Sequence, residues 1–185
     1  IYFLYVDGGM PIYVAAAGGV GVTAVLGWLT HRLVIGYLLD AAPINQLLAT
    51  GGLLFFFQGA AMVAFGIEFR NLGVSLGSLA LSEDIYLSWT RLLSFAIAGG
   101  VVVLLFQFLS RSYLGAAIRA ISQDREIMTL MGVNTTKLYL LTSAIGGALA
   151  GLAAALLALQ YDVHPFIGLS FGPITFIVCV MGGLG

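Results

Sequence analysis

The stretch GAAIRAISQDREIMTLMGVNTTK, residues 115–137, interrupts two long apolar runs and decides how the chain is organised. Five charged side chains fall inside it: Arg119, Asp124, Arg125, Glu126 and Lys137. The whole sequence of 185 residues holds only seven basic and eight acidic side chains. A polar segment of helical pattern therefore lies between two segments that have almost no charge.

The composition indicates an integral membrane protein. Hydrophobic residues make up 61% of the chain, charged residues 8%, and the mean hydropathy is +1.07, whereas roughly a quarter of the residues of a soluble protein are charged. A net charge of -1 without clustered Lys and Arg argues against nucleic-acid binding. Cys179 is the only cysteine, so no internal disulfide is expected.

Four runs are long enough to cross a bilayer, since a helix needs about 20 apolar residues for a core of ~30 Å. These runs contain no Asp, Glu, Lys or Arg and cover residues 8–30, 41–67, 92–110 and 138–161. Strand-like alternation is absent from them, and unpaired backbone groups are not tolerated in lipid. The predicted fold class is an all-α, polytopic transmembrane helix bundle.

A fifth apolar run covers residues 163–185 and contains Pro165 and Pro173. A continuous helix would lose a backbone hydrogen bond at an internal proline. We therefore predict a bent loop followed by a helix that begins near Pro173.

The basic residues predict the orientation, because cytoplasmic loops are enriched in Lys and Arg. If the loops at residues 31–43 and 110–137 share one side, that side holds Arg32, Arg111, Arg119, Arg125 and Lys137. The opposite side holds Arg70 and Arg91. The segment at 110–137 is therefore predicted to be cytoplasmic, in a multi-pass protein of the plasma (inner) membrane.

Small residues recur at helical spacing in two of the runs. The first run carries Ala15, Gly19, Thr23 and Gly27, and the run at 138–161 carries Ala144, Gly147, Ala148, Gly151 and Ala155. Such stripes allow helix backbones to approach closely. We favour packing inside the bundle over a pathway lining or a dimer seam. The chain is expected to be one permease-like domain, residues 1–185, cut at both ends from a longer protein because it begins at Ile1 and ends without a polar tail.

Local signals predict a short helix within residues 115–137. Ser122 and Asp124 are candidate N-caps, Glu126 suits a first helical turn, and Gly132 suits a C-terminal stop. Its apolar residues Ile127, Leu130 and Met131 have the spacing of one helix face. A helix this short must dock to be stable. The candidate partners are the bundle's own surface, lipid headgroups, or a groove in another subunit.

Several motifs resemble the branched-chain amino acid ABC transporter permeases, and among them the smaller, first permease type. They are GAAIRA from residue 115, GGALAGLAAALLAL at 146–159, HPFIGLSFGPITFIVCVMGGLG at 164–185 and, more loosely, LLATGGLLFFFQGAAMVAFG at 47–66. The spacing from Glu126 to Gly132 also resembles the Glu-Ala-Ala-x-x-x-Gly loop by which such permeases touch their ATPases. Ile127 and Met128 stand where that loop has alanines.

The resemblance implies an ATP-driven importer of branched-chain or related amino acids. Its expected partners are a second homologous permease, two ATP-binding subunits, an external substrate-binding protein and membrane lipid. Residues 110–137 would be the coupling segment, with these ATPase-coupling residues: Arg119, Asp124, Arg125, Glu126, Ile127, Leu130, Met131, Gly132 and Asn134.

The chain itself has no motif for nucleotide chemistry, since no glycine-rich loop precedes Lys137. We expect no cofactor, no metal site and no enzymatic activity, and ATP would be hydrolysed by a partner. His31 and His164 are expected on opposite sides of the membrane, too far apart to share a metal. A membrane-embedded enzyme would need a polar cluster within the spans, which is absent from the sequence.

The spans carry no Asp, Glu or His, which ion-coupled carriers usually need. An ion-coupled secondary transporter remains an alternative, because Na⁺ sites can be built from carbonyls. A second alternative is a urea or short-amide ABC permease of the same family. The candidate residues of the translocation path are an intramembrane amide and the breaks of the last run: Gln58, Pro165, Gly168, Gly182, Gly183 and Gly185.

Overall fold

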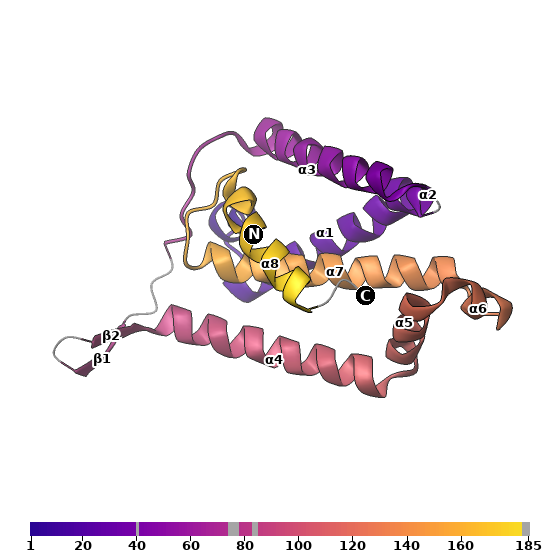
Figure 1. Cartoon of the computed structure of the whole chain (residues 1–185). Coiled ribbons are helices and arrows are strands. Elements are labelled where there is room, and N and C mark those ends of the chain that lie inside the picture. The colour runs from indigo at the N-terminus through magenta and orange to yellow at the C-terminus, as the bar shows by residue number, and fades with distance from the viewer. Residues whose placement is uncertain (40, 74–77, 83–84, 183–185) are drawn as a thin grey trace. The chain divides into compact units, whose positions relative to one another are not determined.

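The computed structural model of the chain describes residues 1–39, 41–73, 78–82 and 85–182 (Figure 1). The chain forms two compact units. The first consists of Ile1–Leu29 and Leu72–Tyr161, and the second of Thr30–Asn71 and Asp162–Gly185. Helices dominate the described residues of both, so the predicted all-α class is confirmed.

The first unit holds most of the helices. They are η1 (Phe3–Asp7), α1 (Ile12–Thr30), α4 (Trp89–Arg111), α5 (Tyr113–Gln123), α6 (Arg125–Leu130) and α7 (Thr135–Ala158), where α1 runs one residue into the second unit. A small antiparallel hairpin of β1 (Ser78–Ser82) and β2 (Ile85–Ser88) leads into α4. The second unit holds η2 (His31–Ile35), α2 (Gly36–Leu38), α3 (Pro43–Phe65) and α8 (Ile167–Gly182).

Among the described residues, four helices are long and apolar enough to cross a membrane, as predicted. They are Ile12–Leu38, Ile44–Phe65, Trp89–Arg111 and Thr135–Ala158. The prediction of a loop at residues 31–43 is wrong, because the first span continues through η2 and α2 to Leu38. The wider π turn preserves the helix: the Gly36 N–H donates to the carbonyls of His31 and Val34.

Pro43 sets the start of the second span. The residue before a proline is disfavoured in the helical region, and Ala42 is extended, with φ −55° and ψ 144°. Pro43 then occupies the start of α3, where its missing N–H costs nothing. The first span therefore ends at Leu38, eight residues after the end of the predicted run at residue 30.

The last run also begins its helix earlier than predicted. Helix α8 starts at Ile167, so Pro173 lies inside it rather than at its start. The turn at residues 165–166 initiates the helix, and the N–H groups of Ile167 and Leu169 donate to the carbonyls of His164 and Phe166 at 3.1 and 3.0 Å. An interior proline is better tolerated in a membrane helix, where neighbouring groups pair the freed carbonyl.

The two stripes of small residues meet within the first unit. A Cβ added at Gly27 would lie 2.6 Å from the Ser143 carbonyl oxygen, and one added at Gly151 would lie 3.1 Å from the Cα of Val20. One added at Gly147 would collide with the Thr23 carbonyl oxygen. The prediction of tight packing is therefore confirmed for α1 against α7.

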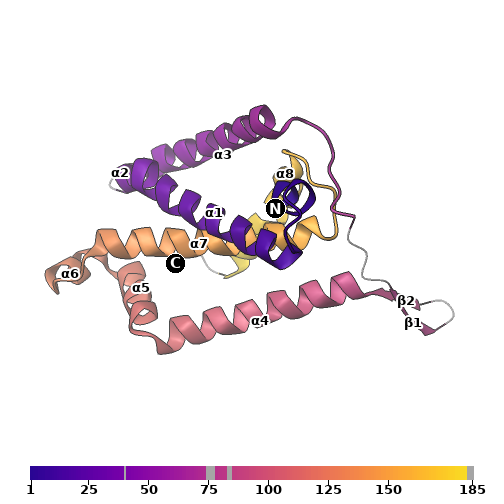
Figure 2. The same ribbon diagram turned by 180° about the vertical axis from the view of Figure 1, so that it is seen from behind.

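The order of these contacts makes α1 and α7 antiparallel. Gly27, late in α1, lies beside Ser143, early in α7, while Val20 lies beside Gly151. The C-terminal end of α1 is therefore at the same end of the pair as the N-terminus of α7, next to which α5 and α6 lie (Figure 2). The predicted cytoplasmic side of the segment at 110–137 stays a prediction.

Candidate functional site

The segment between α4 and α7 begins with a sharp corner. Ser112 caps α5, with its hydroxyl oxygen accepting a hydrogen bond from the Gly115 N–H at 2.9 Å. A Cβ at Gly115 would lie 2.7 Å from the carbonyl carbon of Leu109, in the last turns of α4. Only glycine fits this approach of α5 to α4, so the corner explains the first residue of the GAAIRA motif.

A small apolar core holds α5 on the start of α7. Ala117 and Ile121 of α5 and Leu138 of α7 are buried, and Met128 of α6 and Tyr139 of α7 pack against them. Because α5 is amphipathic, one face supplies this core while Arg119 stays exposed on the other. The contact ties α5, α6 and α7 into one cluster within the first unit.

Helix α6 is only six residues long. Its two ends carry the N-terminal cap and the C-terminal glycine turn that the sequence predicted. Asp124 Oδ1 accepts a hydrogen bond from the Ile127 N–H at 3.1 Å. The Ser122 hydroxyl instead donates to the Arg119 carbonyl at 2.7 Å. Of the two candidate caps, Asp124 is therefore the one that caps α6, because Ser122 still belongs to α5.

The C-terminal end of α6 turns at Gly132, whose φ is +79°. Glycine adopts this left-handed conformation without the steric cost of a Cβ. The Val133 N–H then reaches back to the Met128 carbonyl at 3.2 Å. Asn134 Oδ1 accepts from the Lys137 N–H at 3.0 Å and caps α7. The predicted stop at Gly132 is confirmed, and Asn134 also begins the next helix.

The predicted apolar face of α6 points away from the cluster. Ile127, Leu130 and Met131 are 53%, 87% and 74% exposed, whereas Met128 is half-buried in the small core. The candidate coupling residues whose side chains are described thus lie on exposed parts of one helix-turn-helix segment: Arg119, Asp124, Ile127, Leu130, Met131, Gly132 and Asn134. Arg125 and Glu126 belong to the first turn of α6, and their side chains lie outside the description.

The candidate path residues lie in the second unit, but the structure does not gather them into a cavity. Gln58 is half-buried on α3, Pro165 lies in the turn before α8, and Gly168 and Gly182 are exposed near the two ends of α8. Gly183 and Gly185 lie outside the described residues. Within the part of the chain that is described, a cluster of three metal-ligating side chains is also not found.

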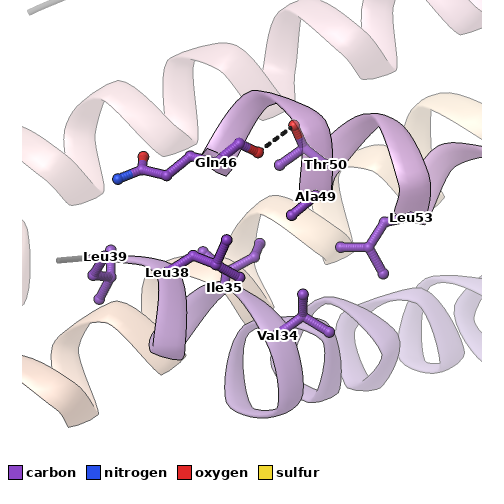
Figure 3. Close-up of a pocket in the computed structure, with 8 residues that line it drawn as sticks. All are labelled: Val34, Ile35, Leu38, Leu39, Gln46, Ala49, Thr50 and Leu53. Atoms are coloured by element: carbon purple, nitrogen blue, oxygen red, sulfur yellow. Dashed lines mark hydrogen bonds between the residues drawn. The ribbon is translucent and has the colours of Figure 1, made fainter. Parts of the chain in front are cut away.

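A small hollow in the second unit was not predicted from the sequence. It lies between η2 and α2 on one side and α3 on the other, has a volume of about 60 Å³, and is lined mostly by aliphatic side chains (Figure 3). The Gln46 amide at its edge donates to the Ala41 carbonyl at 3.1 Å, and the Thr50 hydroxyl donates to the Gln46 carbonyl at 3.0 Å. Ligand pockets are usually ~300 Å³ or more, so this hollow is too small for an amino acid.

A second feature missed from the sequence joins the chain after α3 to the chain before α8. Arg70 and Val163 form an antiparallel bridge, with N–H to carbonyl distances of 3.0 and 2.8 Å. The Asn71 amide donates to Asp162 Oδ1 at 2.6 Å, and the rings of Phe69 and His164 lie 4.7 Å apart. No local periodicity signals a contact between residues 91 positions apart.

Together, the apolar spans and the capped helix between two of them define the class of the protein, a polytopic helical membrane protein with a polar segment between its spans. A profile of the family described as "Branched-chain amino acid transport system / permease component" matches residues 3–185, and the chain belongs to this family. Members are permease subunits of transport systems and not enzymes. The chain is accordingly a multi-pass protein of the plasma (inner) membrane.

Named relatives agree with the family. The chain is similar to the high-affinity branched-chain amino acid transport system permease protein BraD of Pseudomonas aeruginosa, with 32% identity over 177 residues, and to LivH of Escherichia coli, with 29% over 179 residues. Each match covers 92% of this chain and 58% of the relative. The chain therefore spans a little under three fifths of the length of these relatives. No solved structure matches it significantly.

Proposed function

We propose that the chain is the membrane-spanning part of a permease subunit in an ATP-driven importer of branched-chain or related amino acids, and that residues 110–137 are its cytoplasmic coupling segment. The family and the names of BraD and LivH support the transport system. The proposed partners are a second homologous permease, two ATP-binding subunits and an external substrate-binding protein. ATP is bound and hydrolysed by the partners.

The exposed apolar face of α6 carries the coupling proposal. Ile127, Leu130 and Met131 expose more than half of their surface on a helix far too short to be stable alone. Each Å² of such surface that leaves water contributes about 25 cal/mol, and contiguous exposed apolar residues typically mark an interaction site. A short helix laid into a groove of an ATP-binding subunit would cover this face.

The packing under α6 supports a route by which its movement reaches the spans. Met128 anchors α6 to Ile121 of α5 and Leu138 of α7, and α7 is locked to α1 where Gly147 meets Thr23. A displacement of α6 on ATP binding would therefore move α7 and α1 together rather than bend a loop. In this proposal that rigid movement is what alternates access to the path.

The translocation path is proposed to run beside the interrupted last segment. Its candidate residues remain Gln58, Pro165, Gly168, Gly182, Gly183 and Gly185. Pro173 inside α8 leaves the Leu169 carbonyl without its usual helical donor, and an exposed carbonyl at membrane depth is tolerated where it lines a cavity or packs in protein. This argument favours α8 as a path-lining helix.

The test compares two matched substitutions in the full-length permease. Leu130 of α6 and Tyr113 at the start of α5 are both largely exposed, at 87% and 82%. We expect Leu130→Asp to abolish co-purification of the ATP-binding subunits, because a carboxylate cannot enter an apolar groove without large desolvation cost. Tyr113→Asp should leave co-purification unchanged, and membrane insertion should be equal for both. Equal co-purification by the two variants would remove α6 from the interface.

Transport by the reconstituted system separates the alternatives. A panel of binding proteins for branched-chain amino acids, urea and short amides identifies the substrate class. Uptake that requires an ion gradient and no ATP-binding subunit would instead identify an ion-coupled carrier and contradict the importer proposal.

A further inference from the structure

An apolar groove runs between α4 and α7 in the first unit. One face of α4, residues 91–102, lines it together with residues 149–157 of α7 and Gln160 just after that helix, and its volume is about 550 Å³. This volume lies within the ~300–1,000 Å³ of ordinary ligand sites. The groove uses neither the proposed coupling residues nor the candidate path residues.

The walls of the groove offer almost no hydrogen bonds to a ligand. They consist of side chains such as Phe95, Ala98, Leu152 and Leu156. Ser94 also lines the groove, but it is only 6% exposed and its hydroxyl donates to the Thr90 carbonyl at 2.9 Å. The long part of the groove therefore suits a hydrocarbon.

The polar groups gather at one end of the groove. Arg91 lies in the first turn of α4, and Gln160 lies two residues beyond the end of α7, so the start of α4 and the end of α7 share this end of the groove. Among the described residues no carboxylate pairs with Arg91. The exposed Trp89 lies in the same turn, and tryptophan is enriched at the membrane interface. This end of the groove therefore has the chemistry of a headgroup site.

The length of the groove distinguishes a lipid from a free amino acid. The lining residues of α4 run from Arg91 to Val102, eleven residue steps or about 17 Å at 1.5 Å per residue. Half of a ~30 Å hydrocarbon core is about 15 Å. The groove thus spans about one leaflet, which is the reach of an acyl chain and several times that of an amino acid.

We propose that the groove between α4 and α7 binds an anionic phospholipid, with an acyl chain along the apolar walls and the phosphate at the Arg91 guanidinium and the Gln160 amide. Arginine suits phosphate because its donors form paired, charge-assisted hydrogen bonds. An apolar membrane helix in the same place would offer Arg91 no counter-charge, whereas a phosphate does. The site goes beyond the importer function and does not depend on the coupling role of α6.

The experiment measures lipid retention by the full-length permease in its complex. The delipidated complex is titrated with phosphatidylglycerol or with phosphatidylcholine of the same acyl chains, and bound lipid is counted by native mass spectrometry. We expect Arg91→Gln to weaken phosphatidylglycerol binding about tenfold, the loss typical of one hydrogen-bonded charge. Arg111→Gln is the matched control, because it removes the same charge at the other end of α4 and outside the groove.

A second variant tests the apolar part of the site. Ala98→Trp fills the groove and should reduce binding of both lipids equally. Arg91→Gln should weaken the anionic lipid more than phosphatidylcholine, because the choline of the latter offsets the charge of its phosphate. Ala98→Cys should be protected from a thiol reagent by phosphatidylglycerol. Equal effects of Arg91→Gln and Arg111→Gln, or equal affinity for the two lipids, would overturn the proposal. A cross-link from Cys at 98 to another protein helix would show that protein occupies the groove, and would overturn it as well.

Discussion

The seam between α1 and α7 and the surface of α6 are built in opposite ways. At the seam, Gly27 and Gly147 bring two helix backbones together so closely that an added Cβ would meet the neighbouring backbone. On α6, Leu130 and Met131 project from a six-residue helix and are largely exposed. The first contact is made within the chain, whereas the second surface is exposed, and we propose that a partner subunit covers it.

This difference separates residues that stabilise the fold from residues that are exposed and can bind another molecule. In lipid, apolar surface alone does not drive helices together, so close backbone packing must do so. In water, exposed apolar side chains favour association. Small residues are therefore expected to dominate stability in the spans, and large apolar residues to dominate binding in the polar segment.

The largest expected effect comes from enlarging the seam. Gly147→Leu places a side chain against the backbone of Thr23, and overpacking of a tight contact typically costs about 1–3 kcal/mol and occasionally more. We expect most of the folded, monodisperse protein to be lost in size-exclusion chromatography. Gly146→Leu is the control, because a Cβ there meets nothing within 4 Å. If both variants behave alike, the seam is not what holds α1 to α7.

A smaller effect is expected where α6 is anchored, and two methionines on the same helical segment sharpen the comparison. Met128 is half-buried in the small core, whereas Met131 is 74% exposed. Met128→Ala should lower the free energy of local opening of α6 by about 1 kcal/mol, less than the ~2–5 kcal/mol of a fully buried methionine. Hydrogen exchange of the α6 amides should become faster.

Met131→Ala should leave that exchange unchanged but weaken association with the ATP-binding subunits. The reverse result, with fast exchange in Met131→Ala and normal exchange in Met128→Ala, would mean that α6 presents the opposite face.

The smallest effect concerns the N-terminal cap of α6. Asp124→Ala removes the acceptor of the Ile127 N–H, and losing a cap typically costs about 1 kcal/mol or less in an exposed helix. Exchange of the Ile127 amide should become several-fold faster. Ser122→Ala should not change it, because the Ser122 hydroxyl bonds to Arg119 instead. Faster exchange in Ser122→Ala alone would reassign the cap.

Local chemistry made parts of the candidate site predictable. Asp124 and Gly132 follow rules that involve only their nearest neighbours, since a cap acts over three residues and a left-handed turn involves one. The stripe of Gly147 and Gly151 was equally visible as a spacing. The stripe's partner was not visible, because nothing in the spacing says which helix lies opposite.

Other features escaped prediction for identifiable reasons. The first span was ended too early because Arg32 resembled the start of a loop, although an arginine at a membrane interface can stay helical and extend its charge towards water. The start of helix α8 was predicted too late in the chain, because Pro173 was interpreted as the first residue of the helix, although it lies inside α8. The bridge between Arg70 and Val163 joins distant parts of the chain and leaves no local pattern.

Three properties were determined by the sequence itself: the chain lies in a membrane, four of its helices can cross that membrane, and the polar helix begins after its cap Asp124 and stops before Gly132. These properties depend on hydrophobicity and on neighbouring residues. Only the tertiary structure decided that Met128 is turned inward while its neighbour Ile127 is exposed, and that the two glycine stripes meet. Successive positions on a helix face different surroundings, and those surroundings are supplied by residues far away in the chain.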